Sequence, residues 1–125
     1  MEIIATKKAP AAIGPYSQAI KVGHFLYISG QIPINPETGQ MISSSIEEET
    51  IQSLKNLKAI VEEAGGTMAS IVKTTVMLTD MNNFGAMNKA YESMFENHKP
   101  ARAAYAVKKL PKGVNVEIEA VAYIG

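Results

Sequence analysis

Residues 45–78 have the sequence SIEEETIQSLKNLKAIVEEAGGTMASIVKTTVML. Ser45 and Glu48 have the spacing of a capping box, which satisfies free amides at the start of a helix. Apolar side chains then recur at helical spacing and form one stripe, made of Ile51, Leu54, Leu57, Val61 and Ala64. Gly65 and Gly66 are typical of a helix end. Segment 71–78 is rich in β-branched residues and predicts a strand, in which Lys73 and Thr75 alternate with Val72, Thr74 and Val76.

The flanking segments predict further strands and a second helix. Segments 1–6, 19–22 and 25–29 have the composition of short strands, with a hairpin turn near Gly23 and His24. Two prolines and Thr38-Gly39 mark segment 31–40 as a loop. Apolar residues have helical spacing from residue 84 to residue 95, and this helix ends near residue 98. Segments 102–107 and 114–124 predict the last two strands, joined by a turn at 110–113.

This order of elements predicts a single α+β domain over residues 1–125, with both helices on one face of a mixed sheet. Too few elements remain to cover the other face, so we expect another subunit to cover it. The composition favours the same conclusion. Charged residues make up 19% of the chain, below the roughly 25% of average soluble domains, and apolar surface left uncovered is typical of interfaces.

Charge and cysteine content exclude several classes of function. The formal net charge is +0, so nucleic acid is not an expected partner. The chain has no cysteine, which excludes disulfides, thiolate catalysis and cysteine-based zinc sites. His24 and His98 lack the spacing of metal ligands, so we expect no metal site. No stretch has the roughly 20 apolar residues of a membrane span, and the N-terminus lacks a signal-peptide pattern. We therefore expect a cytoplasmic protein with no membrane partner.

Charged residues of the last two strands are the first candidates for chemistry. Glu117 and Glu119 share the face of strand 114–124 opposite to its apolar residues, either as an exposed polar face or as the carboxylates of a cleft. Arg102 is the only arginine of the chain, and its neighbours are small. A guanidinium matches a carboxylate with two hydrogen bonds. Arg102 therefore either pairs with Glu117 or Glu119, or binds a ligand carboxylate.

Two turns near the N-terminus are the second candidates. Gly14-Pro15-Tyr16-Ser17 predicts a rigid turn that carries an aromatic hydroxyl. Ser29-Gly30-Gln31 ends a predicted strand and exposes backbone amides, a possible contact for an anion or carboxylate. A tight turn followed by a strand explains both stretches equally well without any function.

Separated stretches of the chain share motifs with one known family. They are Ala11–Ala19 (AAIGPYSQA), Ser29–Pro33 (SGQIP), Ile71–Val76 with the helix 84–95, and the C-terminal run Pro100–Tyr105, Leu110–Gly113 and Val116–Ala120. Together they resemble the RidA (YjgF) family of reactive-intermediate deaminases over nearly the whole chain. The resemblance implies a chorismate-mutase-like fold, a six-stranded mixed sheet with two helices on one face. It also implies a trimeric barrel of three copies, with sites between subunits and no cofactor.

The activity that this resemblance implies is hydrolysis of 2-iminopropanoate and 2-iminobutanoate to 2-oxo acids and ammonia. These imines are released by pyridoxal-phosphate-dependent dehydratases. Carried over by position, the catalytic residues are Arg102, which binds the substrate carboxylate, Glu117, which activates water, and Tyr16, which closes over the substrate. The substrate-binding residues are Ser29, Gly30, Asn88 and, through its backbone amide, Ala104. Many members have cysteine where this chain has Ala104, and a backbone contact tolerates that difference.

Two other functions stay open on the same scaffold. One is a non-catalytic carboxylate-binding module with a regulatory or chaperone-like role. The other is an endoribonuclease or translation inhibitor, against which the neutral net charge argues. The preferred imine and the dehydratase that supplies it are not indicated by the sequence.

Overall fold

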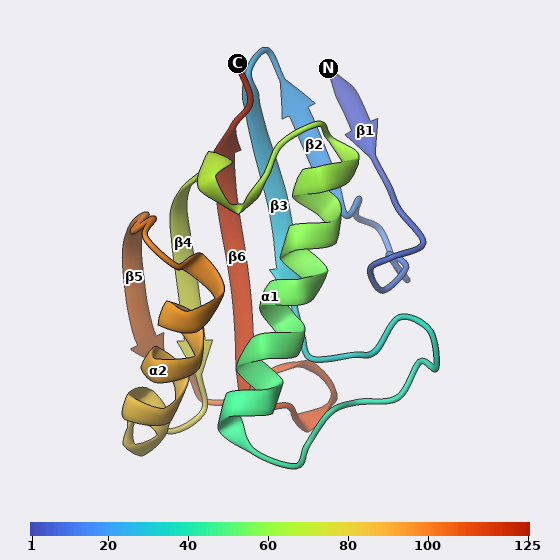
Figure 1. Ribbon diagram of the computed structural model, residues 1–125. Helices are drawn as coiled ribbons and strands as arrows, with labels where there is room; N and C mark the ends of the chain where they lie inside the picture. The colour runs from blue at the N-terminus through green and yellow to red at the C-terminus, as the bar shows by residue number, and fades with distance from the viewer.

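The computed structural model describes all residues, 1–125, as one sheet with helices packed on one of its faces (Figure 1). The six strands lie in the order β1-β2-β3-β6-β4-β5. Neighbouring strands are antiparallel except β4 and β5, which are parallel. Their bounds are β1 Glu2–Ile4, β2 Ala19–Val22, β3 Phe25–Gln31, β4 Ile71–Leu78, β5 Ala101–Ala106 and β6 Val116–Tyr123. The predicted α+β architecture is confirmed.

The helices α1 (Ile46–Glu63) and α2 (Phe84–Phe95) pack against each other, and α1 crosses β3 and β6 (Figure 1). Short 3₁₀ helices, η1 (Met68–Ser70), η2 (Met81–Asn83) and η3 (Pro111–Gly113), occupy connections. Neither α1 nor α2 is long and apolar enough to cross a membrane.

One of the two hydrogen bonds of the predicted capping box is present at the start of α1. The Ser45 hydroxyl oxygen accepts a hydrogen bond from the Glu48 amide at 3.1 Å. The Glu48 carboxylate, however, accepts from the Ser44 hydroxyl, so the reciprocal bond of a capping box to the Ser45 amide is replaced. At the other end, Gly65 has a φ of 94°, a conformation that glycine adopts without strain.

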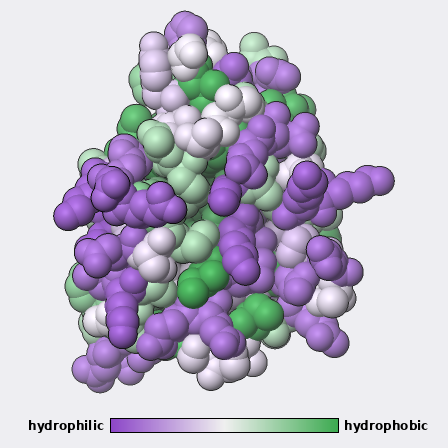
Figure 2. All heavy atoms as spheres, viewed as in Figure 1, coloured by the Kyte–Doolittle hydropathy of each residue, from purple (hydrophilic) through white to green (hydrophobic).

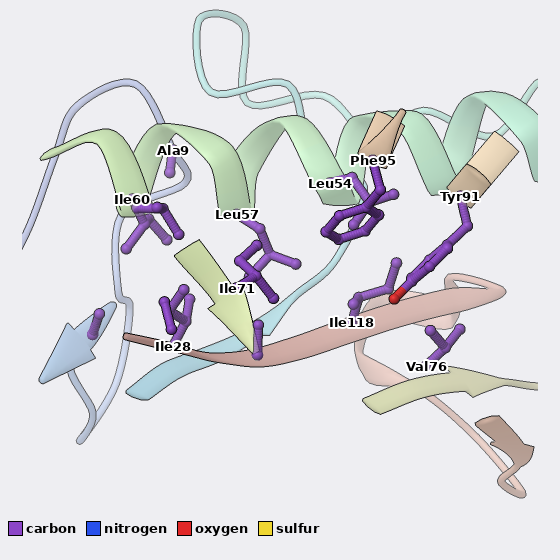
Figure 3. Close-up of a cluster of buried hydrophobic side chains, with 14 of the residues drawn as sticks. Ala9, Ile28, Leu54, Leu57, Ile60, Ile71, Val76, Tyr91, Phe95 and Ile118 are labelled. Carbon is purple, nitrogen blue, oxygen red and sulfur yellow. The ribbon is translucent and has the colours of Figure 1, made fainter. Parts of the chain in front are cut away.

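The core lies between the helices and the sheet (Figure 3). Leu54, Leu57 and Ile60 of α1 are fully buried and point toward the strands. Alternate residues of β6 meet them, namely Val116, Ile118, Ala120 and Ala122. This alternation leaves Glu117 and Glu119 on the helix-free face, as the sequence predicts.

The predicted alternation fails at one position of β4. Thr74 and Val76 are fully buried, but Val72 is 42% exposed. The pairing of β4 with β6 shifts register between Ile71 and Lys73. Such an irregularity adds an unpaired residue to one strand, here Val72, and its side chain leaves the buried face.

The two faces of the molecule differ in polarity. Hydrophilic side chains cover most of the helix-bearing face (Figure 2). On the helix-free face, β6 exposes Tyr123 beside Phe25 of β3, and Tyr27 and Tyr105 are also exposed. Exposed aromatic residues grouped on one sheet face are typical of an interface. That another copy covers them remains a prediction.

Candidate functional site

A cleft of about 840 Å³ contains most of the predicted N-terminal and carboxylate residues. Tyr16, Ser29, Gly30 and Glu117 all line it, and Glu119 and Lys112 belong to the same wall. Its size lies within the range of small-molecule sites, about 300–1,000 Å³. The structure therefore brings together four predicted site residues from three separate segments of the chain.

Tyr16 reaches this cleft from the loop between β1 and β2. The loop is fixed at its base by Gln18, which is 4% exposed. The Gln18 side-chain oxygen accepts from the Thr6 amide at 2.7 Å, and its nitrogen donates to the carbonyl of Pro10 at 2.8 Å. The same nitrogen also donates to the carbonyls of Thr6 and Ala9. The Tyr16 side chain itself is half exposed, so the anchored loop presents it to the cleft.

Ser29 and Gly30 lie where β3 departs from regular pairing with β6. The register shifts between Ile28 and Gln31. The Ser29 hydroxyl donates to the Ser17 carbonyl at 2.6 Å, which ties this irregular segment to the Tyr16 loop. A Cβ atom on Gly30 would lie 2.9 Å from the carboxyl carbon of Glu117. Gly30 therefore gives the Glu117 carboxylate its space.

Glu117 has the electrostatic environment of a proton acceptor. Partial burial raises the pKa of its carboxyl above the ordinary value of 4.5, and the charge of Glu119 raises it further. A carboxylate with a raised pKa holds a proton more readily in a cleft, which suits a general base. Lys112, in the loop before β6, is the cation of the same cleft wall.

Arg102 lies in a second cleft, of about 340 Å³. Its Nη1 donates to the Asn88 side-chain oxygen at 2.7 Å. Its guanidinium also lies over the rings of Phe84 and Tyr91. Asn88, which is predicted as a substrate-binding residue, is thus a hydrogen-bond partner of the Arg102 guanidinium. Ala104 follows two positions along β5 and shares the face of Arg102, since both pair with buried residues of β4.

The two groups of predicted site residues lie on opposite faces of the sheet. Arg102 pairs in register with Thr74, on the helix-bearing face. Glu117 pairs with Met77, on the helix-free face. This arrangement excludes the alternative that Arg102 forms an ion pair with Glu117 or Glu119 of its own chain. Within one chain, the cleft of Tyr16 and Glu117 lacks the arginine.

Several residues around these clefts were missed from the sequence. The sequence predicts Tyr91 and Phe84 only as apolar residues of the helix 84–95, but they also flank Arg102. Their signal is present in the sequence, because positions 84, 88 and 91 follow the i, i+4, i+7 spacing of one helix face. Gln18 has no such signal, since its side chain bonds to the backbone of Thr6, Ala9 and Pro10, in a loop whose path only the fold determines.

Each histidine has one ring nitrogen close to a backbone carbonyl oxygen. His98 Nε2 lies 2.6 Å from the Ile71 carbonyl oxygen, and His24 Nδ1 lies 3.1 Å from that of Ile124. No group of three or more histidine, cysteine, aspartate or glutamate residues gathers at a possible metal site.

With this geometry in place, comparison with known proteins identifies the family. The sequence model of the family described as Endoribonuclease L-PSP matches residues 6–124. The chain belongs to this family. A solved structure of RidA from the Antarctic bacterium Psychrobacter sp. PAMC 21119 is 45% identical, with a TM-score of 0.95. The match covers 99% of this chain and 100% of that one, so the RidA resemblance is confirmed.

Two further relatives carry functional names. The Mus musculus protein named 2-iminobutanoate/2-iminopropanoate deaminase is 52% identical over 124 residues, which cover 99% of this chain and 92% of the relative. The crystal structure of E. coli TdcF with bound serine is 41% identical, with a TM-score of 0.96 and full coverage (100%) of both chains. RidA-family members thus include named deaminases and a protein that holds a small amino acid.

Proposed function

We propose that this RidA-family chain hydrolyses short 2-imino acids, such as 2-iminopropanoate and 2-iminobutanoate, to 2-oxo acids and ammonia. The observation that carries the proposal is the pair of complementary clefts: a guanidinium in one, and a carboxylate with a raised pKa in the other. The name of the mouse relative supports the same reaction. The serine bound by TdcF supports a substrate of similar size with a carboxylate.

Arg102 would bind the substrate carboxylate. Asn88 takes one N–H of the guanidinium, which has five, so the others remain for a ligand. A carboxylate held by two parallel hydrogen bonds has a defined orientation. That orientation fixes the imine carbon relative to the attacking water, which accounts for much of the rate gain expected in such a reaction.

Glu117 would supply the proton transfers. Its carboxylate takes a proton from water as the oxygen forms a bond to the imine carbon, and the π-electron pair of the C=N bond moves to nitrogen. The nitrogen takes up the proton that Glu117 removed from water, which gives a carbinolamine. Glu117 then takes the hydroxyl proton and passes it to the amino nitrogen, so that the C=O bond forms as the C–N bond breaks and ammonia leaves. One carboxyl group that alternates between base and acid can serve both steps.

The proposal requires a site assembled between copies of the chain. Arg102 and Glu117 of one chain face opposite sides of the sheet, whereas one small substrate must reach both. The exposed aromatic residues of the helix-free face support burial against another copy. We therefore propose a homotrimer, as the family resemblance implies, in which Arg102 of one copy reaches the Tyr16 and Glu117 cleft of the next.

The direct test is hydrolysis of imines made in place. A dehydratase releases 2-aminoacrylate from serine, and 2-oxo acid formation is followed with wild type, Arg102→Ala and Arg102→Lys. We expect wild type to accelerate hydrolysis, Arg102→Ala to abolish the acceleration, and Arg102→Lys to restore part of it, because lysine keeps the charge without the two-bond geometry. No acceleration by wild type over buffer would refute the proposed function.

The family description keeps an endoribonuclease as the second candidate. RNA cleavage that persists in Arg102→Ala and Glu117→Gln would place that activity outside the clefts described above. Binding of 2-oxobutanoate without imine turnover would instead favour a carboxylate-binding module.

A further inference from the structure

Two aromatic rings of α2 flank Arg102. Its Cζ atom lies 4.9 Å from the centroid of the Tyr91 ring and 5.4 Å from that of Phe84. Both distances are within the roughly 6 Å reach of a cation–π interaction. Together with Asn88, these residues lie on one face of α2, and all three contact the guanidinium.

The Tyr91 ring is itself held in place. Tyr91 is 7% exposed, and its hydroxyl lies 2.7 Å from the Thr74 hydroxyl in a buried hydrogen bond. Figure 3 shows the ring extending from α2 toward the sheet, with the hydroxyl oxygen at its far end. Thr74 is the residue of β4 that pairs in register with Arg102 of β5. The strand neighbour of Arg102 therefore fixes the ring against which Arg102 lies.

The Tyr91 hydroxyl stays protonated in this setting. Burial raises the pKa of the phenol above its ordinary value of 10.0, while the Thr74 hydrogen bond and the Arg102 charge act in the opposite direction. The ring therefore acts on Arg102 through its π face and not as a phenolate.

We propose that Tyr91, fixed by Thr74, is a positioning residue that holds the Arg102 guanidinium in the orientation in which it binds a ligand carboxylate. This inference rests on the carboxylate-binding role proposed for Arg102. An arginine side chain has many rotamers, and a side chain ordered before binding loses less entropy when the ligand arrives. The Asn88 hydrogen bond and the two rings supply that order to the guanidinium.

The first test observes Arg102 directly. Because Arg102 is the only arginine, its Nε–Hε group gives a single, unambiguous signal in ¹⁵N NMR. We expect this signal to be displaced by the ring current and to remain so in Tyr91→Phe, which keeps the ring. In Tyr91→Leu it should move toward the position of a free arginine. The matched control is Phe95→Leu, since Phe95 is a buried ring of α2 that packs on Tyr91 but forms no cation–π pair with Arg102.

The second test measures the consequence for binding. We expect Tyr91→Leu to weaken the affinity for 2-oxobutanoate, and to raise KM for the imine, by roughly tenfold, with a smaller change in kcat. Tyr91→Phe keeps the ring but loses the Thr74 hydrogen bond, so its loss of affinity should lie between those of wild type and Tyr91→Leu. Phe95→Leu should change the affinity by no more than about twofold. In an Arg102→Ala background, Tyr91→Leu should cause no further loss, because the residue on which it acts is gone.

Two results would overturn the inference. One is an Arg102 signal unchanged in Tyr91→Leu. The other is an equal loss of affinity in Tyr91→Leu whether or not Arg102 is present, which would make Tyr91 a packing residue only. Failure of the proposed function is distinguishable, because 2-oxobutanoate binding and the NMR signal do not depend on turnover. A wild type that binds this ligand but does not hydrolyse imines keeps the inference and removes the proposed reaction.

Discussion

Arg102 and Glu117 lie on opposite faces of one sheet, separated in strand order by β4. Arg102 faces α2, and Glu117 faces the helix-free side together with exposed aromatic residues. A substrate with a few carbon atoms is too small to bridge the two faces of a sheet. If both residues act on one substrate, they must come from different copies of the chain.

This relationship predicts complementation between two inactive variants. Arg102→Ala and Glu117→Gln should each lose imine hydrolysis, but unfolding and refolding them together should restore activity. In a cyclic assembly each site takes one residue from each of two copies. An equal mixture should therefore recover about one quarter of the wild-type activity. Either variant refolded alone is the control, and absence of recovery in mixed oligomers would contradict a shared site.

The second prediction concerns pH. A general base must be ionised. The pKa of Glu117 is raised above the ordinary value of 4.5, so the activity should fall with decreasing pH around this raised pKa. Glu119→Gln removes the like charge that contributes to this rise. The fall in activity should therefore move to lower pH, while burial, the larger cause, keeps the pKa above the ordinary value. Glu62→Gln, an exposed change on α1, is the control and should leave the profile in place.

Much of the fold could be predicted from patterns local to each element. The apolar stripe of α1 and the alternation along β6 identify the buried faces, because side-chain periodicity follows from backbone geometry alone. The exposed position of Val72 could not be predicted in this way. It depends on an irregular pairing with β6, a strand more than 40 residues away in the sequence.

The same distinction applies to the candidate site: local motifs identify its residues, but the fold decides which of them come together. Motifs identify Tyr16, Ser29, Gly30 and Glu117, which the fold brings into one cleft. No motif reveals that Arg102 opens on the other face, because that depends on which neighbour β5 pairs with. The bond between Tyr91 and Thr74 likewise joins residues of a helix and a strand whose packing angle is a property of the whole fold.

The third prediction tests the space that Gly30 provides. Gly30→Ala should displace the Glu117 carboxylate, because the added Cβ would lie 2.9 Å from its carboxyl carbon. We expect a loss of activity of at least about tenfold. The change in stability should be small, because the displaced atoms are the end of a flexible, partly exposed side chain. Gly85→Ala is the matched control, since a Cβ there meets nothing within 4 Å. Full activity in Gly30→Ala would show that the carboxylate position is not critical.

The fourth prediction concerns the anchor of the Tyr16 loop. Gln18→Glu keeps the shape of the side chain but replaces its donor, so a carboxylate would face the carbonyls of Thr6, Ala9 and Pro10. An ionised group buried against acceptors is costly. The variant should unfold at lower denaturant concentration than wild type at neutral pH, and recover part of the difference at acidic pH, where a protonated carboxyl can donate.

This recovery has a defined sign. The folded state would raise the pKa of the new carboxyl, so its contribution to stability is retained at low pH and is lost as the pH rises through that pKa. Gln40→Glu, at an exposed position, is the control and should show no such dependence. A Gln18→Glu variant as stable as wild type at neutral pH would mean that the anchor bonds are dispensable.

The last prediction tests whether the guanidinium charge of Arg102 must stay available for the substrate carboxylate when its position is unchanged. Asn88 accepts a hydrogen bond from Nη1 through a neutral amide, which leaves the guanidinium charge available to a ligand. Asn88→Asp keeps this geometry but places a negative charge 2.7 Å from the same nitrogen. The new carboxylate should compete with the substrate carboxylate and raise KM by about tenfold or more, with little change in kcat. Asn82→Asp, which adds the same charge at an exposed position before α2, should leave KM unchanged. If Asn88→Asp binds 2-oxobutanoate as tightly as wild type, the carboxylate is bound elsewhere than at Arg102.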